Sequence, residues 1–145
     1  MKSICVVTVA RSDYGILKPI LNCIEKEPAL ELRLIVAGMH LSPRYGRTID
    51  EIIKDGFKIT GKIDCNLVSD SPKGIATSIG SALKGYANYF SKNKPDILLV
   101  LGDRSEMYAA ALAALPFNIP VAHVHGGELS EGAIDDALRH SMTKL

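Results

Sequence analysis

The fold is decided by Asp96-Ile97-Leu98-Leu99-Val100-Leu101, which runs straight into Gly102-Asp103-Arg104-Ser105-Glu106. A continuous apolar run, without polar alternation, is typical of a strand that is covered on both faces. The stretch from about 104 to 115 then predicts a helix. A buried strand that passes through a polar turn into a helix indicates an α/β fold with a parallel sheet.

The rest of the chain repeats this alternation. Apolar runs predict strands at Ser3–Val9, Leu30–Ala37, Phe57–Ile63, Asp96–Leu101 and Pro120–Val124. Helical patterns lie at 13–27, 47–55, 73–92 and 104–115, with a last one from about 133. We therefore expect one α/β domain over residues 1–145, an open parallel doubly wound (Rossmann-like) sheet with right-handed crossovers.

Composition narrows the range of partners. The formal net charge of +1 provides no basic field for nucleic acid or a membrane surface, so neither is an expected partner. No apolar run reaches the roughly 18 residues of a membrane span. The run Ile4–Ala10 is interpreted as a strand and not a signal peptide, because Arg11 follows at once. The three cysteines form no C-x-x-C pair, which favours the reducing cytoplasm.

A site is expected beyond the carboxyl ends of the strands, where the strand order reverses. With the order 3-2-1-4-5, the segments after the first and fourth strands share one crevice, which Arg11, Asp13, Asp103 and Arg104 would line. Such arginines suit an anion at helix N-termini. The first turn is not G-x-G-x-x-G and no Walker A sequence occurs, so no dinucleotide cofactor is expected. Helix capping is the alternative role, for Ser12 or Asp13 and for Asp103 with Glu106.

The segment after the fifth strand reads His123-Val124-His125-Gly126-Gly127-Glu128. Residues 123 and 125 of one strand share a face, which makes a metal pair an alternative. The helix that follows carries Asp135 with Arg139 and Asp136 with His140, each pair four residues apart. That spacing predicts two ion pairs on the helix surface.

At these residues the sequence resembles the hydrolysing UDP-N-acetylglucosamine 2-epimerases. The matching pieces run in order through the whole chain: Arg11-Ser12-Asp13-Tyr14-Gly15, Val36-Ala37-Gly38-Met39-His40, Tyr45-Gly46, Gly102-Asp103-Arg104, His123–Glu128, Asp135-Asp136, Arg139-His140-Ser141 and Thr143-Lys144-Leu145. The resemblance implies a glycosyltransferase-B-type fold of two nucleotide-fold domains, with the active site between them. This chain would be the N-terminal domain, and it ends inside a helical pattern. We expect a C-terminal nucleotide-binding domain to be missing, and this chain to be inactive alone.

The resemblance also implies a reaction without a redox cofactor or a metal. UDP is eliminated across carbons 1 and 2 of the sugar, and water then adds to the glycal-like intermediate. The product is N-acetylmannosamine, or a 2,4-diacetamido-trideoxy analogue on the sialic or legionaminic acid route. Such chemistry needs proton-transfer groups on both faces of the sugar and cations near the leaving diphosphate. The full-length enzyme is expected to be a cytoplasmic homodimer or homotetramer that binds a UDP-N-acetylhexosamine.

Residue roles follow from the resemblance, position by position. Asp103 and Asp135 match the proposed acid and base carboxylates. The positions matched to substrate binding are Arg11, Gly15 (a contacting serine in some members), His40, Arg104 and Arg139, with Arg139 orienting Asp135 or the substrate.

The sequence departs from the family pattern at one catalytic position. Many members have His-x-Glu-Gly-Gly-Glu, where the first glutamate is proposed as catalytic, and this chain has His125 there. A histidine titrates near neutral pH and suits acid or base work. Either His125 or Glu128 would take the catalytic role. Two alternatives remain for the chain: a metal-dependent hydrolase using His123, His125, His140 and Glu128, or an inactive fragment that binds nucleotide sugar.

Overall fold

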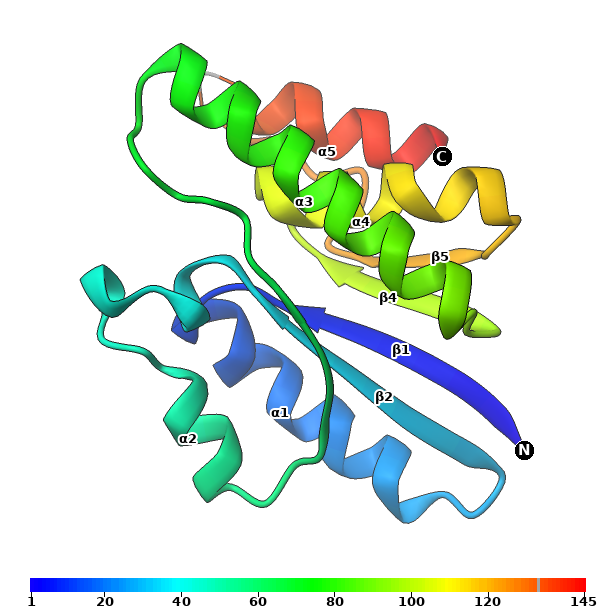
Figure 1. Cartoon of the computed structure of the whole chain (residues 1–145). Coiled ribbons are helices and arrows are strands. Elements are labelled where there is room, and N and C mark those ends of the chain that lie inside the picture. The colour runs from blue at the N-terminus through cyan, green and yellow to red at the C-terminus, as the bar shows by residue number, and fades with distance from the viewer. Residues whose placement is uncertain (133) are drawn as a thin grey trace.

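The structure describes residues 1–132 and 134–145. In the computed structural model, these residues form one sheet of five parallel strands in the order β3-β2-β1-β4-β5 (Figure 1). The strands are β1 (Lys2–Thr8), β2 (Leu30–Ala37), β3 (Ile59–Ile63), β4 (Ile97–Leu101) and β5 (Val121–Val124). The predicted fold class and strand order are confirmed, with strand ends that differ by two residues at most.

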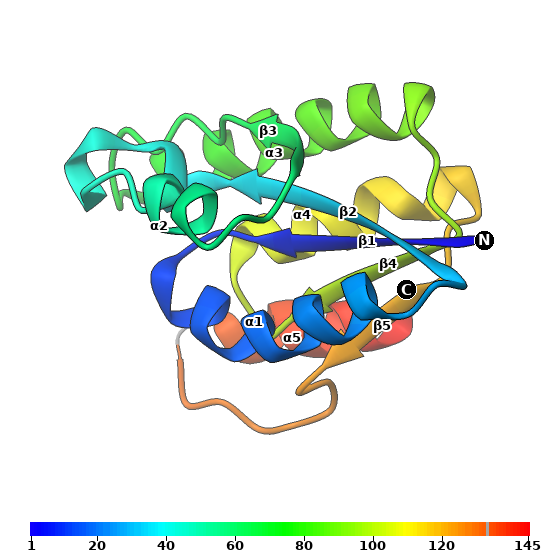
Figure 2. The same ribbon diagram turned by 90° about the horizontal axis from the view of Figure 1, so that it is seen from below.

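Helices cover both faces of the sheet, as the two views show (Figures 1 and 2). The helices α1 (Arg11–Lys26) and α2 (Ile49–Lys54) lie on one face. The helices α3 (Pro72–Lys92), α4 (Ser105–Ala114) and α5 (Asp135–Lys144) lie on the other. Short 3₁₀ turns occur at η1 (Gly38–Leu41), η2 (Pro43–Tyr45) and η3 (Leu115–Phe117). Among the described residues, no helix is long and apolar enough to cross a bilayer.

The core is divided between the two faces of the sheet. On β1, Val6 packs with Leu17 and Leu21 of α1, whereas Val7 belongs to the cluster of Tyr86 and Phe90 of α3. All six side chains are fully buried. Neighbouring side chains of a strand point to opposite faces, so a strand covered on both sides must be apolar throughout. This is the physical reason for the continuous apolar runs of the sequence.

Asp13 fixes the start of α1. Its carboxylate accepts hydrogen bonds from the backbone N–H groups of Val9 at 2.9 Å and Ala10 at 2.7 Å, and from the Thr8 hydroxyl at 3.3 Å. The predicted capping role of Asp13 is confirmed. Loss of hydration raises the pKa of this buried carboxyl, against the lowering effect of those hydrogen bonds. Asp13 therefore joins the end of β1 to the helix that carries Arg11.

Two glycines of α3 provide a matched test of how the helix packs on the sheet. A Cβ at Gly85 would lie 2.7 Å from Cγ2 of Ile63, whereas a Cβ at Gly80 would meet nothing within 4 Å. We expect Gly80→Ala to raise the free energy of unfolding by about 0.5–1 kcal/mol, because alanine is the better helix former. Gly85→Ala should lower it by about 1–3 kcal/mol through overpacking against β3. Denaturant unfolding measures both, and equal stabilisation by the two changes would contradict the packing described here.

Candidate functional site

Polar segments meet at the carboxyl edge of the sheet, beyond β1, β4 and β5. Because β1 pairs with β4, the turn into α1 lies beside the turn into α4. A small hollow of about 110 Å³ lies between the turns, lined by Ser12 and Asp13 from one side and Gly102, Asp103 and Arg104 from the other. A crevice therefore lies at the predicted reversal of strand order, with Asp13, Asp103 and Arg104 on its wall; Arg11, which was also expected there, does not line it.

A large hollow of about 390 Å³ lies on the other side of Arg104, which lines both hollows. Glu106 and Asp135 provide carboxylates on its wall. Its apolar wall comes from Met39, Tyr45, Leu67, Ile75, Ile134 and Leu138. Four of these apolar residues are not singled out by the sequence: Ile75 and Leu138 lie in helices, where an apolar side chain is expected in the core, and Leu67 and Ile134 lie outside helices and strands. Only the Met39 and Tyr45 segments were noted, through the resemblance.

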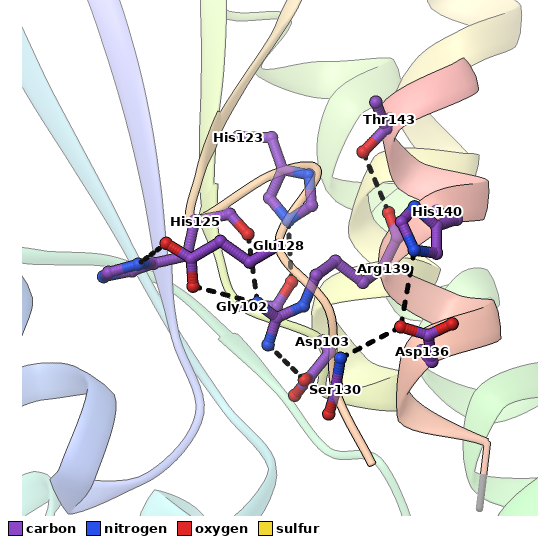
Figure 3. Close-up of polar contacts among 10 residues, drawn as sticks. All are labelled: Gly102, Asp103, His123, His125, Glu128, Ser130, Asp136, Arg139, His140 and Thr143. Atoms are coloured by element: carbon purple, nitrogen blue, oxygen red, sulfur yellow. Dashed lines mark hydrogen bonds and ion pairs between the residues drawn. The ribbon is translucent and has the colours of Figure 1, made fainter. Parts of the chain in front are cut away.

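Arg139 of α5 connects the carboxyl ends of β4 and β5 (Figure 3). Its Nη2 donates to Asp103, and its Nη1 donates to Oε2 of Glu128 at 3.2 Å and to the carbonyl oxygen of His125 at 3.3 Å. The Arg139 side chain is only 11% exposed. Asp103, His125, Glu128 and Arg139 are called the Arg139 cluster below. Its two carboxylates raise the pKa of Arg139, the hydrogen bond to Asp103 most of all.

Two predictions for these residues are wrong. Arg139 does not pair with Asp135; its guanidinium reaches back over the helix N-terminus to Asp103 and Glu128, where two carboxylates compensate its burial. Asp103 does not cap α4, since the N-cap residue is Arg104 and no side chain bonds there. The other predicted pair, Asp136 with His140, is confirmed at 3.3 Å.

His125 and Glu128 form a tight turn after β5. The backbone of His125 has a φ of +60°, in the left-handed region that non-glycine residues seldom occupy. Its Nδ1 lies 2.8 Å from Oε1 of Glu128. The hydrogen bond from His125 lowers the pKa of Glu128, with a smaller contribution from Arg139. Both side chains are about half exposed at the edge of the site.

His123 has a different role from His125. Its Nε2 lies 2.6 Å from the carbonyl oxygen of Gly102, so this nitrogen carries the proton and ties β5 to the end of β4. The expected common face of His123 and His125 is wrong, because β5 ends at Val124 and the chain turns at His125. Within residues 1–132 and 134–145, no three histidine, cysteine or acidic side chains are grouped to hold a metal ion.

The other predicted binding residues are distributed unevenly. Asp135 lines the large hollow, with its carboxylate against Gly132. Arg11 is exposed on the first turn of α1 and lies 3.4 Å from a carboxylate oxygen of Glu51. Gly15 faces open space on the same helix, with nothing within 4 Å of an added Cβ.

His40 lies behind the site and is fully buried. Its Nε2 is 2.9 Å from Oγ1 of Thr8 and its Nδ1 is 2.7 Å from Oγ1 of Thr48, so both ring nitrogens are occupied. Burial lowers the pKa of His40 to about 4. The structure does not bring this side chain to either hollow. It connects β1 to η1 and to the start of α2.

Arg139→Lys should destabilise the protein, because one ammonium cannot reproduce the planar fork that joins Asp103, Glu128 and the His125 carbonyl. We expect the midpoint of thermal unfolding to fall by several degrees. His140→Asn is the matched control on the same helix: it breaks only the exposed pair with Asp136 and should leave the midpoint nearly unchanged. Equal effects of the two changes would contradict a supporting role for Arg139.

His40 should make stability depend on pH in the weakly acidic range. Its pKa is about 4 in the folded protein against 6.5 when unperturbed, so the unfolded chain takes up the proton first as the pH falls. The contribution of neutral His40 to the free energy of unfolding is fully present above pH 6.5. It is lost as the pH falls towards 4, by on the order of 2–3 kcal/mol. The Cε1 proton of His40, followed by NMR, should titrate with a midpoint near 4. We also expect His40→Gln to lose less stability than the wild type between pH 7 and pH 4.5. An NMR titration midpoint near 6.5 for His40 would contradict this prediction.

Comparison with known proteins gives a consistent result. The family model described as UDP-N-acetylglucosamine 2-epimerase matches residues 22–145. The chain is 42% identical, over all 145 residues, to the UDP-N,N'-diacetylbacillosamine 2-epimerase (hydrolyzing) of Legionella pneumophila. It is 40% identical over 145 residues to the polysialic acid biosynthesis protein P7 of Escherichia coli. The chain spans 38% and 37% of the lengths of these two relatives.

Solved structures support the fold. The UDP-GlcNAc 2-epimerase of Methanocaldococcus jannaschii, in complex with UDP-GlcNAc and UDP, superposes with a TM-score of 0.80 at 24% identity, over 99% of this chain and 38% of that one. The Neisseria meningitidis UDP-GlcNAc 2-epimerase bound to UDP-GlcNAc gives a TM-score of 0.76 at 20% identity, over 99% and 38%. At these identities the likeness concerns the fold alone.

Proposed function

Because the chain belongs to the UDP-N-acetylglucosamine 2-epimerase family, we propose that it is part of a hydrolysing epimerase that acts on a UDP-N-acetylhexosamine. In this reaction UDP leaves carbon 1 as a proton leaves carbon 2, and water then adds to the resulting double bond. The products are UDP and a free sugar inverted at carbon 2, N-acetylmannosamine or a 2,4-diacetamido-trideoxy analogue. The observation that carries the proposal is the meeting of Asp103, His125, Asp135 and Arg104 at one edge of the sheet.

We propose that residues 1–145 are the N-terminal domain of a two-domain enzyme. The chain spans 38% of the length of the Legionella pneumophila relative, which leaves room for a second domain of similar size. The sugar would lie against the carboxyl edge of the sheet, and a second domain would hold most of the nucleotide. Turnover would then belong to the whole protein. A cytoplasmic homo-oligomer is part of the same proposal.

The two carboxylates of the proposed chemistry lie in different surroundings. Asp135 faces the large hollow, where it can reach a sugar, and Asp103 lies at the small hollow with Arg139 on one oxygen. A reaction with proton transfer on both faces of the ring needs two such separate groups. Arg104 lies between the hollows at the N-terminus of α4, which suits it to the departing diphosphate.

The sugar itself is proposed as a class, with two members to compare. Relatives at 40–42% identity are named as epimerases of UDP-N,N'-diacetylbacillosamine and of UDP-N-acetylglucosamine. The apolar wall of the large hollow, including Met39, Leu67 and Ile75, suits the methyl groups of either sugar. A 6-deoxy, 4-acetamido sugar has more apolar surface to bury there.

The test is product analysis of the full-length protein in heavy water, with and without a chelator. UDP-N-acetylglucosamine and its 4-acetamido-4,6-dideoxy derivative are compared as substrates. We expect release of UDP and a 2-epimerised sugar that carries deuterium at carbon 2, unaffected by the chelator. No UDP from either substrate would overturn the proposal.

Asp103→Asn and Asp135→Asn should each lower kcat by about 10²–10⁴-fold, because an amide cannot transfer the proton. Asp136→Asn is the matched control beside Asp135. Its carboxylate bonds to the Ser130 N–H and to His140 away from the hollows, so kcat should change by less than about threefold. Initial rates of UDP release measure all three, and a control as impaired as Asp135→Asn would contradict the assigned roles.

A further inference from the structure

Contacts within the Arg139 cluster distinguish between His125 and Glu128, the two residues that could take the role of the catalytic glutamate found in many family members. We propose that, of these two residues, His125 transfers a proton through its Nε2, alongside Asp103 and Asp135, and that Glu128 is a positioning residue that acts through His125. This assignment rests on the proposed epimerase function. Both carboxylate oxygens of Glu128 already have partners, Oε1 with Nδ1 of His125 and Oε2 with Nη1 of Arg139.

The contact with Glu128 determines the tautomer of His125. Nδ1 of His125 lies 2.8 Å from Oε1 of Glu128. A carboxylate accepts hydrogen bonds but does not donate them, so Nδ1 carries the hydrogen. The neutral ring then presents the lone pair of Nε2, which has no hydrogen-bond partner in the part of the chain that the structure describes. His123 has the opposite arrangement, with Nε2 engaged by the Gly102 carbonyl. Nδ1 of His123 has no partner but is buried, whereas the His125 side chain is about half exposed at the edge of the site.

The backbone reinforces this orientation. Arg139 holds the carbonyl oxygen of His125 as well as Glu128, so one guanidinium fixes both ends of the pair (Figure 3). The turn also keeps His125 in a left-handed conformation that a side chain of this size seldom adopts. Such conformations persist where the surrounding contacts enforce them, and they gather at functional sites. The His125 side chain is 47% exposed, so a sugar can reach it.

The chemistry is that of a carboxylate-oriented imidazole. In the elimination step, Nε2 of neutral His125 takes the proton from carbon 2. The electron pair of that C–H bond forms the double bond between carbons 1 and 2, and the C1–O bond breaks with its pair leaving on UDP. The imidazolium is stabilised by Glu128 and returns its proton to water. Three charged groups lie around His125. Glu128 contacts its ring directly, Arg139 of α5 pairs with Glu128, and Asp103, which follows β4, pairs with Arg139.

A double-mutant cycle in the full-length enzyme tests the assignment. Glu128→Gln should lower kcat by about 10- to 100-fold with little change in KM, as loss of an orienting partner does. In a His125→Glu background, which restores the His-x-Glu-Gly-Gly-Glu pattern of many family members, the same change should cost less than about twofold. Glu131→Gln in the same loop is the control and should leave kcat and KM unchanged.

The outcomes separate this assignment from the proposed function. Equal losses of kcat from Glu128→Gln in both backgrounds would make Glu128 the acting carboxylate and overturn the assignment while the epimerase function stands. Absence of turnover by the wild-type protein would overturn both. NMR of the ¹⁵N-labelled imidazole supplies a readout that needs no activity: neutral His125 should carry its hydrogen on Nδ1, and the Nε2–H tautomer would overturn the assignment.

Discussion

The guanidinium of Arg139 is the contact on which the rest of the site depends. A cation that is only 11% exposed is stable only when its charge is compensated, and groups from two segments distant in sequence do this. Asp103 follows β4, whereas Glu128 and the His125 carbonyl follow β5. The position of α5, the turn after β5 and the end of β4 are therefore set together. Removing either carboxylate would leave the Arg139 guanidinium with less compensation for its charge, and removing Arg139 would leave both carboxylates without their cation.

The architecture was largely predictable, because burial on both faces leaves a direct trace in the sequence. The runs around Val6 and Leu98 could only be strands with helices above and below. The errors occur where apolar residues are buried without joining the sheet. Phe57 was assigned to a strand that begins at Ile59; its ring instead packs edge-on against Tyr14, with centroids 6.4 Å apart. The 3₁₀ turns were not predicted, since three or four residues are too short to show a period.

The candidate site was predictable in its place in the fold, and much less so in its contacts. Parallel strands deliver their carboxyl ends to one edge, so the strand order alone brought Asp13 and Asp103 together. The spacing of four residues wrongly predicted a pair between Asp135 and Arg139. An exposed ion pair at this spacing stabilises a helix by only about 0.2–0.5 kcal/mol. The partly buried contact between Arg139 and Asp103 outweighs such a pair, and no rule of spacing reveals it. The burial of His40 likewise depends on Thr8 and Thr48, which the fold alone brings to it.

Three arginines at this edge of the sheet differ in their contacts, and the contacts determine how much positive charge each has available for an anionic ligand. Arg139 is neutralised by two carboxylates and has little positive charge left for a ligand. Arg11 is exposed and meets only Glu51 at 3.4 Å, a surface contact that costs little to break. Arg104 contacts the thioether of Met39 and, within the described residues, forms no ion pair. A diphosphate leaving group needs cations that gain contacts as its charge develops. Arg139 is held by two carboxylates, so in the proposed reaction Arg104 and Arg11 would be the cations for the leaving diphosphate. Each lies in the first turn of a helix, where the backbone N–H groups favour an anion.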